Sequence, residues 1–259
     1  MSEPAAPEPR GDRAGRSLEE LRLALAFLTI LPVGPRRAVA RESVAESLAW
    51  FPLCGFMIGA LLAVADSILG FMSGRPLRSA LIVLSLTVLT GALHLDGLAD
   101  TADALGAGRD RERALETMRD SAIGSFGAIA LFFALALKMI ALAAIVGHRR
   151  SAALYLAPGL ARWAMVAVSC GLEYLRAEGA GSTLLEADAK RSFAFASITT
   201  LTAVLLAPSR RMLGACGASA VAALAMRGFY RRWLGGVTGD ALGAAGEIVE
   251  AIVLVVMAA

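Results

Sequence analysis

Cysteine and histidine are scarce in this 259-residue chain, which contains three cysteines and two histidines. The cysteines, Cys54, Cys170 and Cys216, stand alone within apolar stretches and never occur at C-x-x-C spacing. Neither a disulfide framework nor a zinc site is indicated, because both require clustered thiols or imidazoles. We expect the three cysteines to be packing residues.

Charged and aromatic residues are also few, at 18% and 6% of the chain. The net charge of +3 comes almost wholly from arginine in short loops, without a basic stripe that interleaves aromatic residues. Nucleic acid is therefore not the expected partner. Hydrophobic residues, in contrast, make up 57% of the chain, and the mean hydropathy is +0.66. A soluble domain has about 45 to 50% apolar residues, so a membrane protein is indicated.

Apolar segments recur along the chain, and a hydrocarbon core of about 30 Å requires about 20 apolar residues of helix. The segments lie at about residues 21–31, 50–72, 79–95, 124–147, 151–175, 193–208, 212–230 and 241–259. The first is too short to span and ends at Pro32, which favours a re-entrant or interfacial helix. We predict an all-α, polytopic transmembrane helical bundle with about seven spans plus this short N-terminal helix.

The first 20 residues are rich in proline, glycine and mixed charge. Such a segment cannot bury enough apolar surface to offset its ordering entropy. We therefore expect residues 1–20 to be a disordered tail and residues 21–259 to form a single transmembrane domain. Glu19 and Glu20 flank the first apolar segment and argue against a cleaved signal peptide.

Arginine is distributed unevenly between the two sets of loops that this topology creates. One set contains most of the basic residues: Arg36, Arg37, Arg41, Arg109, Arg111, Arg113, Arg119, Arg176, Lys190, Arg191, Arg227, Arg231 and Arg232. The other set contains Arg75, Arg78, Arg149, Arg150, Arg210 and Arg211. Because basic residues near the ends of spans favour the cytoplasm, the first set of loops is expected to be cytoplasmic.

The densest polar motif is HLDGLADTAD, at residues 94–103. In a helix, Asp96, Asp100 and Asp103 would share one face, where like charges repel. Such a face calls for a cation, and oxygen ligands favour Mg²⁺, which takes one or two carboxylates and completes its shell with waters and substrate phosphates. The motif therefore predicts Mg²⁺-dependent transfer of a phosphate-linked group. The alternative is that these aspartates are merely solvated or cap helices.

Basic and polar residues elsewhere suit a phosphate-bearing substrate, since arginine binds phosphate oxygens bidentately. The candidate substrate-binding residues are Arg119, Asp120, Ser121, Arg162, Arg176 and Glu178. Arg162 lies inside an apolar segment, where a charge is costly and is expected to face a polar cavity. Solvated loop residues are the alternative for Arg119, Asp120, Ser121, Arg176 and Glu178.

The last loop reads GGVTGDALGAAGEIVE and contains Asp240, Glu247 and Glu250. Its glycines allow the backbone to approach a ligand closely. Glu247 and Glu250 lie inside the final apolar segment, so they are expected to face the interior of the bundle. Lys138 is a further charged residue within an apolar segment, either functional or snorkelling toward the interface.

Together these motifs resemble the cobalamin synthase family, the adenosylcobinamide-GDP ribazoletransferases. The blocks HLDGLADTADAL and GGVTGDALGA are the specific ones, and the resemblance covers nearly the whole chain after the tail. It implies a multi-pass enzyme of the cell inner membrane that depends on Mg²⁺. Such an enzyme joins adenosylcobinamide-GDP to α-ribazole or its 5′-phosphate and releases GMP.

The resemblance also implies roles for individual residues. Metal binding falls to Asp96, Asp100, Asp103 and Asp240. Phosphate binding falls to Arg119 and Arg162, and His94 or Glu250 is the candidate general base. The alternative for His94 is a packed, hydrogen-bonded side chain. The implied catalytic set is His94, Asp96, Asp100, Asp103 and Glu250.

The expected partners are the two substrates and membrane lipid, and assembly into a homo-oligomer is left open. The rival hypothesis is a membrane cation or metabolite transporter, since acidic residues in a helical bundle also bind transported ions. The acidic residues lie at the cytoplasmic ends of segments rather than at their midpoints, which argues for the enzyme.

Overall fold

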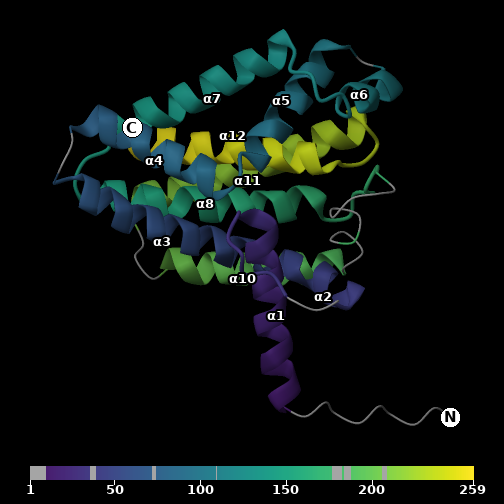
Figure 1. Ribbon diagram of the computed structural model, residues 1–259, viewed down its shortest axis with the longest axis horizontal. Helices are drawn as coiled ribbons and strands as arrows, with labels where there is room; N and C mark the ends of the chain where they lie inside the picture. The colour runs from purple at the N-terminus through teal and green to yellow at the C-terminus, as the bar shows by residue number, and fades with distance from the viewer. Residues whose placement is uncertain are drawn as a thin grey trace.

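The computed structural model describes residues 10–35, 39–71, 74–108, 110–176, 183, 188–205 and 209–259. These residues form helices and connecting loops, without a named strand (Figure 1). The elements are α1 (Arg10–Leu28), α2 (Arg41–Glu46), η1 (Ser47–Trp50), α3 (Phe51–Leu69), α4 (Arg75–Leu89), α5 (Leu93–Gly106), α6 (Arg111–Thr117), α7 (Ser125–Ala144), α8 (His148–Ser169), α10 (Ala189–Leu205), α11 (Arg210–Trp233) and α12 (Gly239–Ala258). The predicted all-α class is confirmed.

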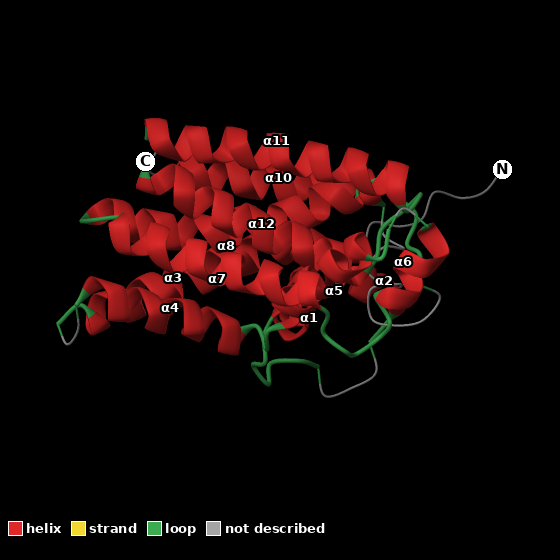
Figure 2. Ribbon diagram, turned by 90° about the horizontal axis from the view of Figure 1, so that it is seen from above, coloured by secondary structure: helices red, strands yellow, loops and turns green. Residues whose placement is uncertain are grey.

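The long helices run side by side, with α8 in the centre of the bundle (Figures 1 and 2). Helix α8 packs against α3, α10, α11 and α12. Two glycines of α3 make its approach to α8 close: a Cβ at Gly55 would lie 2.3 Å from the carbonyl oxygen of Pro158, and one at Gly59 would lie 2.5 Å from that of Leu154. Small residues at such spacing permit helix packing in lipid.

Five helical segments among the described residues are long and apolar enough to cross a membrane: Arg41–Leu69, Ser125–Ala144, His148–Ser169, Arg210–Trp233 and Gly239–Ala258. Helices α4 and α5 together would supply a sixth span, bent by 89°. The structure thus supports five or six spans. The remaining predicted span, at about residues 193–208, corresponds to α10, which has 17 described residues.

The predicted continuous segment at residues 79–95 is wrong, because the chain turns between α4 and α5. Gly91 and Ala92 both adopt positive φ, at 58° and 57°, and these left-handed residues end one helix before Leu93 begins the next. Hydropathy alone does not reveal this turn, since the residues on both sides of it are apolar. As a result, the motif at residues 94–103 lies on a separate helix that packs between α7 and α12.

Helix α1 runs across the direction of the bundle helices (Figure 1) and is not among the segments able to span. The structure describes residues 10–20 as helical, so the predicted disordered tail does not extend to residue 20; residues 1–9 lie outside the described part. Packing explains the difference. Glu20 accepts a hydrogen bond from the Trp50 indole at 2.9 Å, and Ala24 and Leu28 are fully buried.

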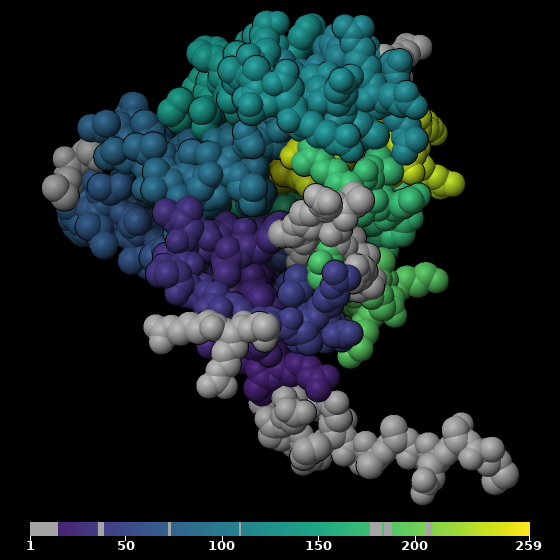
Figure 3. All heavy atoms as spheres, turned by 45° about the vertical axis from the view of Figure 1, so that its right-hand side comes forward, coloured from purple at the N-terminus to yellow at the C-terminus, as the bar shows by residue number. Residues whose placement is uncertain are grey.

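Three connecting segments meet at one end of the bundle, here called the acidic end. Their described residues are 107–108 with 110–124, 170–176 and 234–239. They are joined by backbone hydrogen bonds from Leu175 N to Val237 O and from Val237 N to Glu173 O, at 3.0 and 2.8 Å. Arg111 Nε also donates to Leu234 O at 2.6 Å. Figure 3 brings this end forward, with α5 to α7 forming its upper part.

Candidate functional site

Helix α5 lies against the start of α12 because glycines separate the two backbones. A Cβ at Gly97 would lie 2.8 Å from Asp240 Cα, and a Cβ at Gly243 would lie 3.2 Å from His94 Cα. This close packing brings Asp96 and Asp100 of α5 to the helix end that bears Asp240. Asp96 is exposed, and Asp100 and Asp240 are half-buried.

Like charges dominate this site. Asp100 interacts electrostatically with Asp96, Asp240 and Asp103, and its favourable interaction is with Arg176. Arg176 Nη2 donates to Asp240 Oδ2 at 2.5 Å and to the carbonyl oxygen of Met118 at 2.8 Å. Four carboxylates and one guanidinium leave an excess of negative charge, which a cation would relieve.

Asp103 has a different set of partners from the other aspartates. Its Oδ2 accepts from Gly124 N at 2.7 Å and its Oδ1 accepts from Gly127 N at 2.8 Å, where α7 begins. A carboxylate at a helix N-terminus satisfies free N–H groups and complements the helix dipole. Asp103 therefore caps the start of α7, as the helix-capping alternative expected.

The remaining candidate substrate residues are divided between two places. Arg119, Asp120 and Ser121 are exposed in the loop between α6 and α7, and Asp120 Oδ1 accepts from Ala122 N at 3.0 Å. Arg176 lies beside Asp96, Asp100 and Asp240, and these four residues are here called the acidic site. Glu178 lies outside the described residues.

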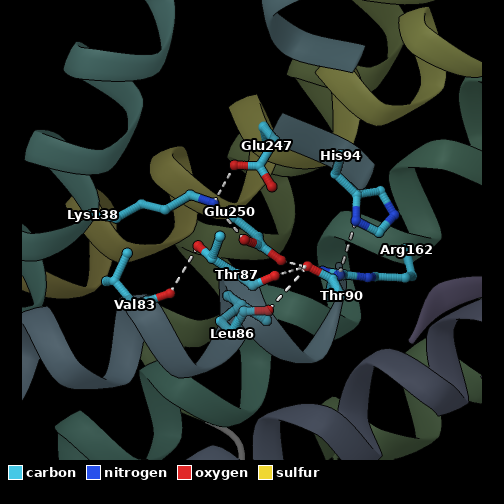
Figure 4. Close-up of polar contacts among 9 residues, drawn as sticks. All are labelled: Val83, Leu86, Thr87, Thr90, His94, Lys138, Arg162, Glu247 and Glu250. Atoms are coloured by element: carbon cyan, nitrogen blue, oxygen red, sulfur yellow. Dashed lines mark hydrogen bonds and ion pairs between the residues drawn. The ribbon is translucent and has the colours of Figure 1, made fainter. Parts of the chain in front are cut away.

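A second polar cluster, here called the ionic network, is buried inside the bundle (Figure 4). Lys138 Nζ from α7 lies 2.5 Å from Glu247 Oε2 and 2.6 Å from Glu250 Oε2, both on α12. Arg162 of α8 pairs with the other oxygen of Glu250 and lies 3.5 Å from His94 Nδ1. The four charged residues are at most 5% exposed, and two cations balance two anions.

Three of the expected catalytic and substrate-binding residues lie in or beside the ionic network. Glu250 is 1% exposed and lies between two cations, Lys138 and Arg162. His94 is also buried, and its Nε2 finds no hydrogen-bond partner among the residues that the structure describes.

Lys138 is paired in the interior, so the snorkelling interpretation is wrong. The sequence did contain a signal for this pairing. Two glutamates at i and i+3 inside an apolar helix require cations, and Lys138 and Arg162 are two basic residues deep within other apolar segments. Their separation in sequence, 109 to 112 residues for Lys138, concealed which groups would meet.

The family model for cobalamin-5-phosphate synthase matches residues 20–258. This chain belongs to that family. An adenosylcobinamide-GDP ribazoletransferase of Syntrophobacter fumaroxidans is 42% identical over 237 residues, which cover 89% of this chain and 94% of the relative. Proteins with the same description from Geotalea daltonii and Escherichia coli K12 are 35% and 34% identical, covering 92% and 90% of this chain and 96% of each relative. No solved structure matches the chain.

For this member of the cobalamin-5-phosphate synthase family, the acidic site can be compared with what a metal ion requires. Among the residues that the structure describes, no three or more His, Cys, Asp or Glu side chains form a ready metal cage. Mg²⁺ does not need one, because it usually takes one or two carboxylates and fills its shell with waters and phosphates. One or two of the carboxylates of Asp96, Asp100 and Asp240 would meet that requirement.

Proposed function

We propose that this chain is a membrane-embedded adenosylcobinamide-GDP ribazoletransferase. It joins adenosylcobinamide-GDP to α-ribazole or its 5′-phosphate and releases GMP, the step that assembles the nucleotide loop of cobalamin. Membership of the cobalamin-5-phosphate synthase family supports the reaction. The structural observation that carries the proposal is the gathering of Asp96, Asp100 and Asp240 beside Arg176 at one end of the bundle.

Asp96, Asp100 and Asp240 are the residues that we assign to Mg²⁺. When bound, Mg²⁺ neutralises charge on the diphosphate of the substrate. Asp103 is left to cap α7. Asp240 is held by Arg176, so the same guanidinium can stabilise a neighbouring phosphate oxygen, as arginine forks do.

The reaction requires an attacking hydroxyl, a leaving group and a place for one proton. The ribazole 3′-hydroxyl oxygen forms a bond to the cobinamide-side phosphorus, the bridging P–O bond breaks, and GMP leaves with that bond's electron pair. We assign Arg176 and Arg119, two of the arginines at this end, to balance the phosphate charge, so positioning and electrostatics supply most of the catalysis. The hydroxyl proton passes to an exposed group at the acidic end, since His94 and Glu250 are buried.

The proposed location is the cell inner membrane, with the acidic end on the cytoplasmic side. Loop arginines predominate at this end, as expected of cytoplasmic loops. Helix α10 is assigned as a seventh span and α1 as an interfacial helix. Lipid covers the outer faces of α7 and α11, where Phe132, Phe133 and Leu224 are 57 to 68% exposed.

The test is an assay of the purified protein in vesicles with adenosylcobinamide-GDP, α-ribazole 5′-phosphate and Mg²⁺. GMP release that requires both organic substrates supports the transferase. A membrane cation or metabolite transporter is the rival, and substrate accumulation inside the vesicles without GMP release would favour it and contradict the proposal.

A further inference from the structure

We propose that the ionic network positions the acidic site: Lys138, Glu247 and Glu250 set the placement of α7 and α12, and thereby hold α5 so that Asp96 and Asp100 lie against Asp240. Lys138 and Glu247 are then positioning residues for the transferase. This inference rests on the proposed function. The residues of the ionic network are buried inside the bundle and do not belong to the acidic site, so their role can also be tested by a structural measurement.

The acidic site and the ionic network both use residues on one face of α12. Asp240, Gly243, Glu247 and Glu250 are spaced by three or four residues and therefore lie on the same helix face. Asp240 and Glu247 are seven residues apart, which is about 10 Å along a helix. Helix α5 packs on this face near the N-terminal end of α12, where Gly97 lies against Asp240.

Helix α7 is bonded at two points to α5 and α12, the two helices that form the acidic site. At its start, Gly124 N and Gly127 N donate to Asp103 of α5. Farther along, Lys138 donates to Glu247 and Glu250 of α12. A shift of α7 along its axis would lengthen at least one set of these bonds, so α7 fixes the register of α5 relative to α12.

The central helix, α8, also takes part in the ionic network. Arg162 of α8 binds Glu250 and approaches His94, which precedes Asp96 by two residues on α5. Side chains from α5, α7, α8 and α12 thus meet in one cluster, as Figure 4 shows. Its two cations and two anions balance in charge.

Stability alone does not require these charges. A buried ion pair can often be replaced by apolar residues of similar volume without loss of stability, whereas removal of one partner is costly. What apolar packing lacks is direction, and the short contacts from Lys138 to both glutamates fix distance and orientation. A charge-balanced replacement should therefore preserve folding and disturb catalysis.

The opposite end of the bundle supplies a matched control. Asp66 of α3 pairs with Arg150 of α8, with Oδ1 2.7 Å from Nη2, and Arg150 Nη1 donates to Ser79 Oγ of α4 at 3.1 Å. Asp66 and Arg150 are 4% and 2% exposed. This cluster is as buried as the ionic network, but its side-chain partners lie on α3, α4 and α8, away from the acidic end. Arg150 also donates to the carbonyl oxygen of Leu142, near the C-terminal end of α7, so the control pair includes the loss of one contact with α7.

The experiment compares Lys138→Met/Glu247→Gln, which stays charge-balanced with Glu250 and Arg162, with Asp66→Asn/Arg150→Met. We measure kcat and KM for adenosylcobinamide-GDP, the unfolding temperature, and hydrogen exchange of residues 93–106. The first pair should lower kcat about tenfold or more with KM nearly unchanged, and should speed exchange in α5, since a misplacement of about 1 Å is enough for such losses. The second pair should leave kcat and α5 exchange close to the wild type, whatever its unfolding temperature.

Lys138→Arg keeps the charge and should retain more activity than Lys138→Met. If the double variant does not fold, Glu247→Asp, which only shortens the side chain, is measured in the same way and should show a smaller loss in the same direction. Wild-type kcat and α5 exchange in the balanced variant, or equal losses in the control pair, would overturn the inference. A wild-type protein without transferase activity would refute the proposed function instead, while the exchange comparison still decides the positioning of α5.

Discussion

Gly97 of α5 rests on the backbone of Asp240 in α12, and a methyl group at position 97 would lie 2.8 Å from both Asp240 Cα and its carbonyl oxygen. Backbone atoms cannot move aside as a flexible side chain can. Gly97→Ala is therefore expected to separate the two helices and lower kcat about tenfold or more, because small misplacements of reacting groups are costly. Steady-state kinetics and the unfolding temperature measure the effect.

Gly228→Ala is the control for this change. A Cβ at Gly228 of α11 meets nothing within 4 Å, and alanine favours a helix over glycine by roughly 1 kcal/mol. This variant should keep its activity and unfold at the same or a higher temperature. A fully active Gly97→Ala protein would contradict the close packing of α5 on α12.

A substitution of Asp100 distinguishes a loss of metal binding from a loss of folding. Asp100→Asn removes a negative charge from a site that also contains Asp96 and Asp240, so the folded state loses repulsion while the metal loses a ligand. We expect activity to fall about 100-fold, a loss of about 2.7 kcal/mol of transition-state stabilisation, with an unchanged or higher unfolding temperature. Glu112→Gln, an exposed change on α6, should leave both unaltered. Wild-type activity in a folded Asp100→Asn protein would remove this residue from the mechanism.

Asp103 should behave differently from Asp100. Asp103→Ala removes the acceptor for two N–H groups at the start of α7, and loss of a helix cap typically costs about 1 kcal/mol, up to about 2. The expected result is a lower unfolding temperature together with lower activity, measured by thermal unfolding in detergent and by GMP release. Unchanged stability would show that these capping bonds are not formed.

The contrast between these aspartates shows what the sequence could and could not predict. The spacing of Asp96, Asp100 and Asp103 correctly places them on one helix, and composition correctly predicts an all-helical membrane protein. Spacing does not show that the Asp103 side chain accepts a hydrogen bond at the start of α7, 21 residues further along the chain. Such long-range partners depend on how the helices pack.

The turn between α4 and α5 could not be predicted from hydropathy either. Hydropathy remains high through Gly91 and Ala92, and only their backbone angles end the helix. Likewise, the need for cations beside Glu247 and Glu250 follows from their position in an apolar helix. The contact with Lys138 follows only from the placement of α7 against α12.

Glu20 gives a pH dependence outside the membrane spans. Burial raises the pKa of the Glu20 carboxyl above its ordinary 4.5, and its neighbour Glu46 raises it further, against the lowering effect of the Trp50 hydrogen bond. A raised folded-state pKa contributes stability below the unfolded pKa, and that contribution is lost as the pH rises through the folded value. Ionised Glu20 is therefore unfavourable in the folded protein at neutral pH.

Glu20→Gln keeps an acceptor for Trp50 without the charge. Its unfolding temperature should exceed that of the wild type at pH 7, and the difference should shrink as the pH falls toward 4. Thermal unfolding across this range measures it. A difference that is constant with pH, or that grows in acid, would contradict the buried environment of Glu20.

The acidic end is proposed to join two substrates and expel GMP. The most direct measurement follows both products in one reaction, by mass spectrometry, with purified wild type and Asp100→Asn in vesicles supplied with adenosylcobinamide-GDP, α-ribazole 5′-phosphate and Mg²⁺. GMP and the joined cobalamin phosphate should form in equal amounts with the wild type and fall together in the variant. GMP without the joined product, or equal rates from both proteins, would contradict this proposal.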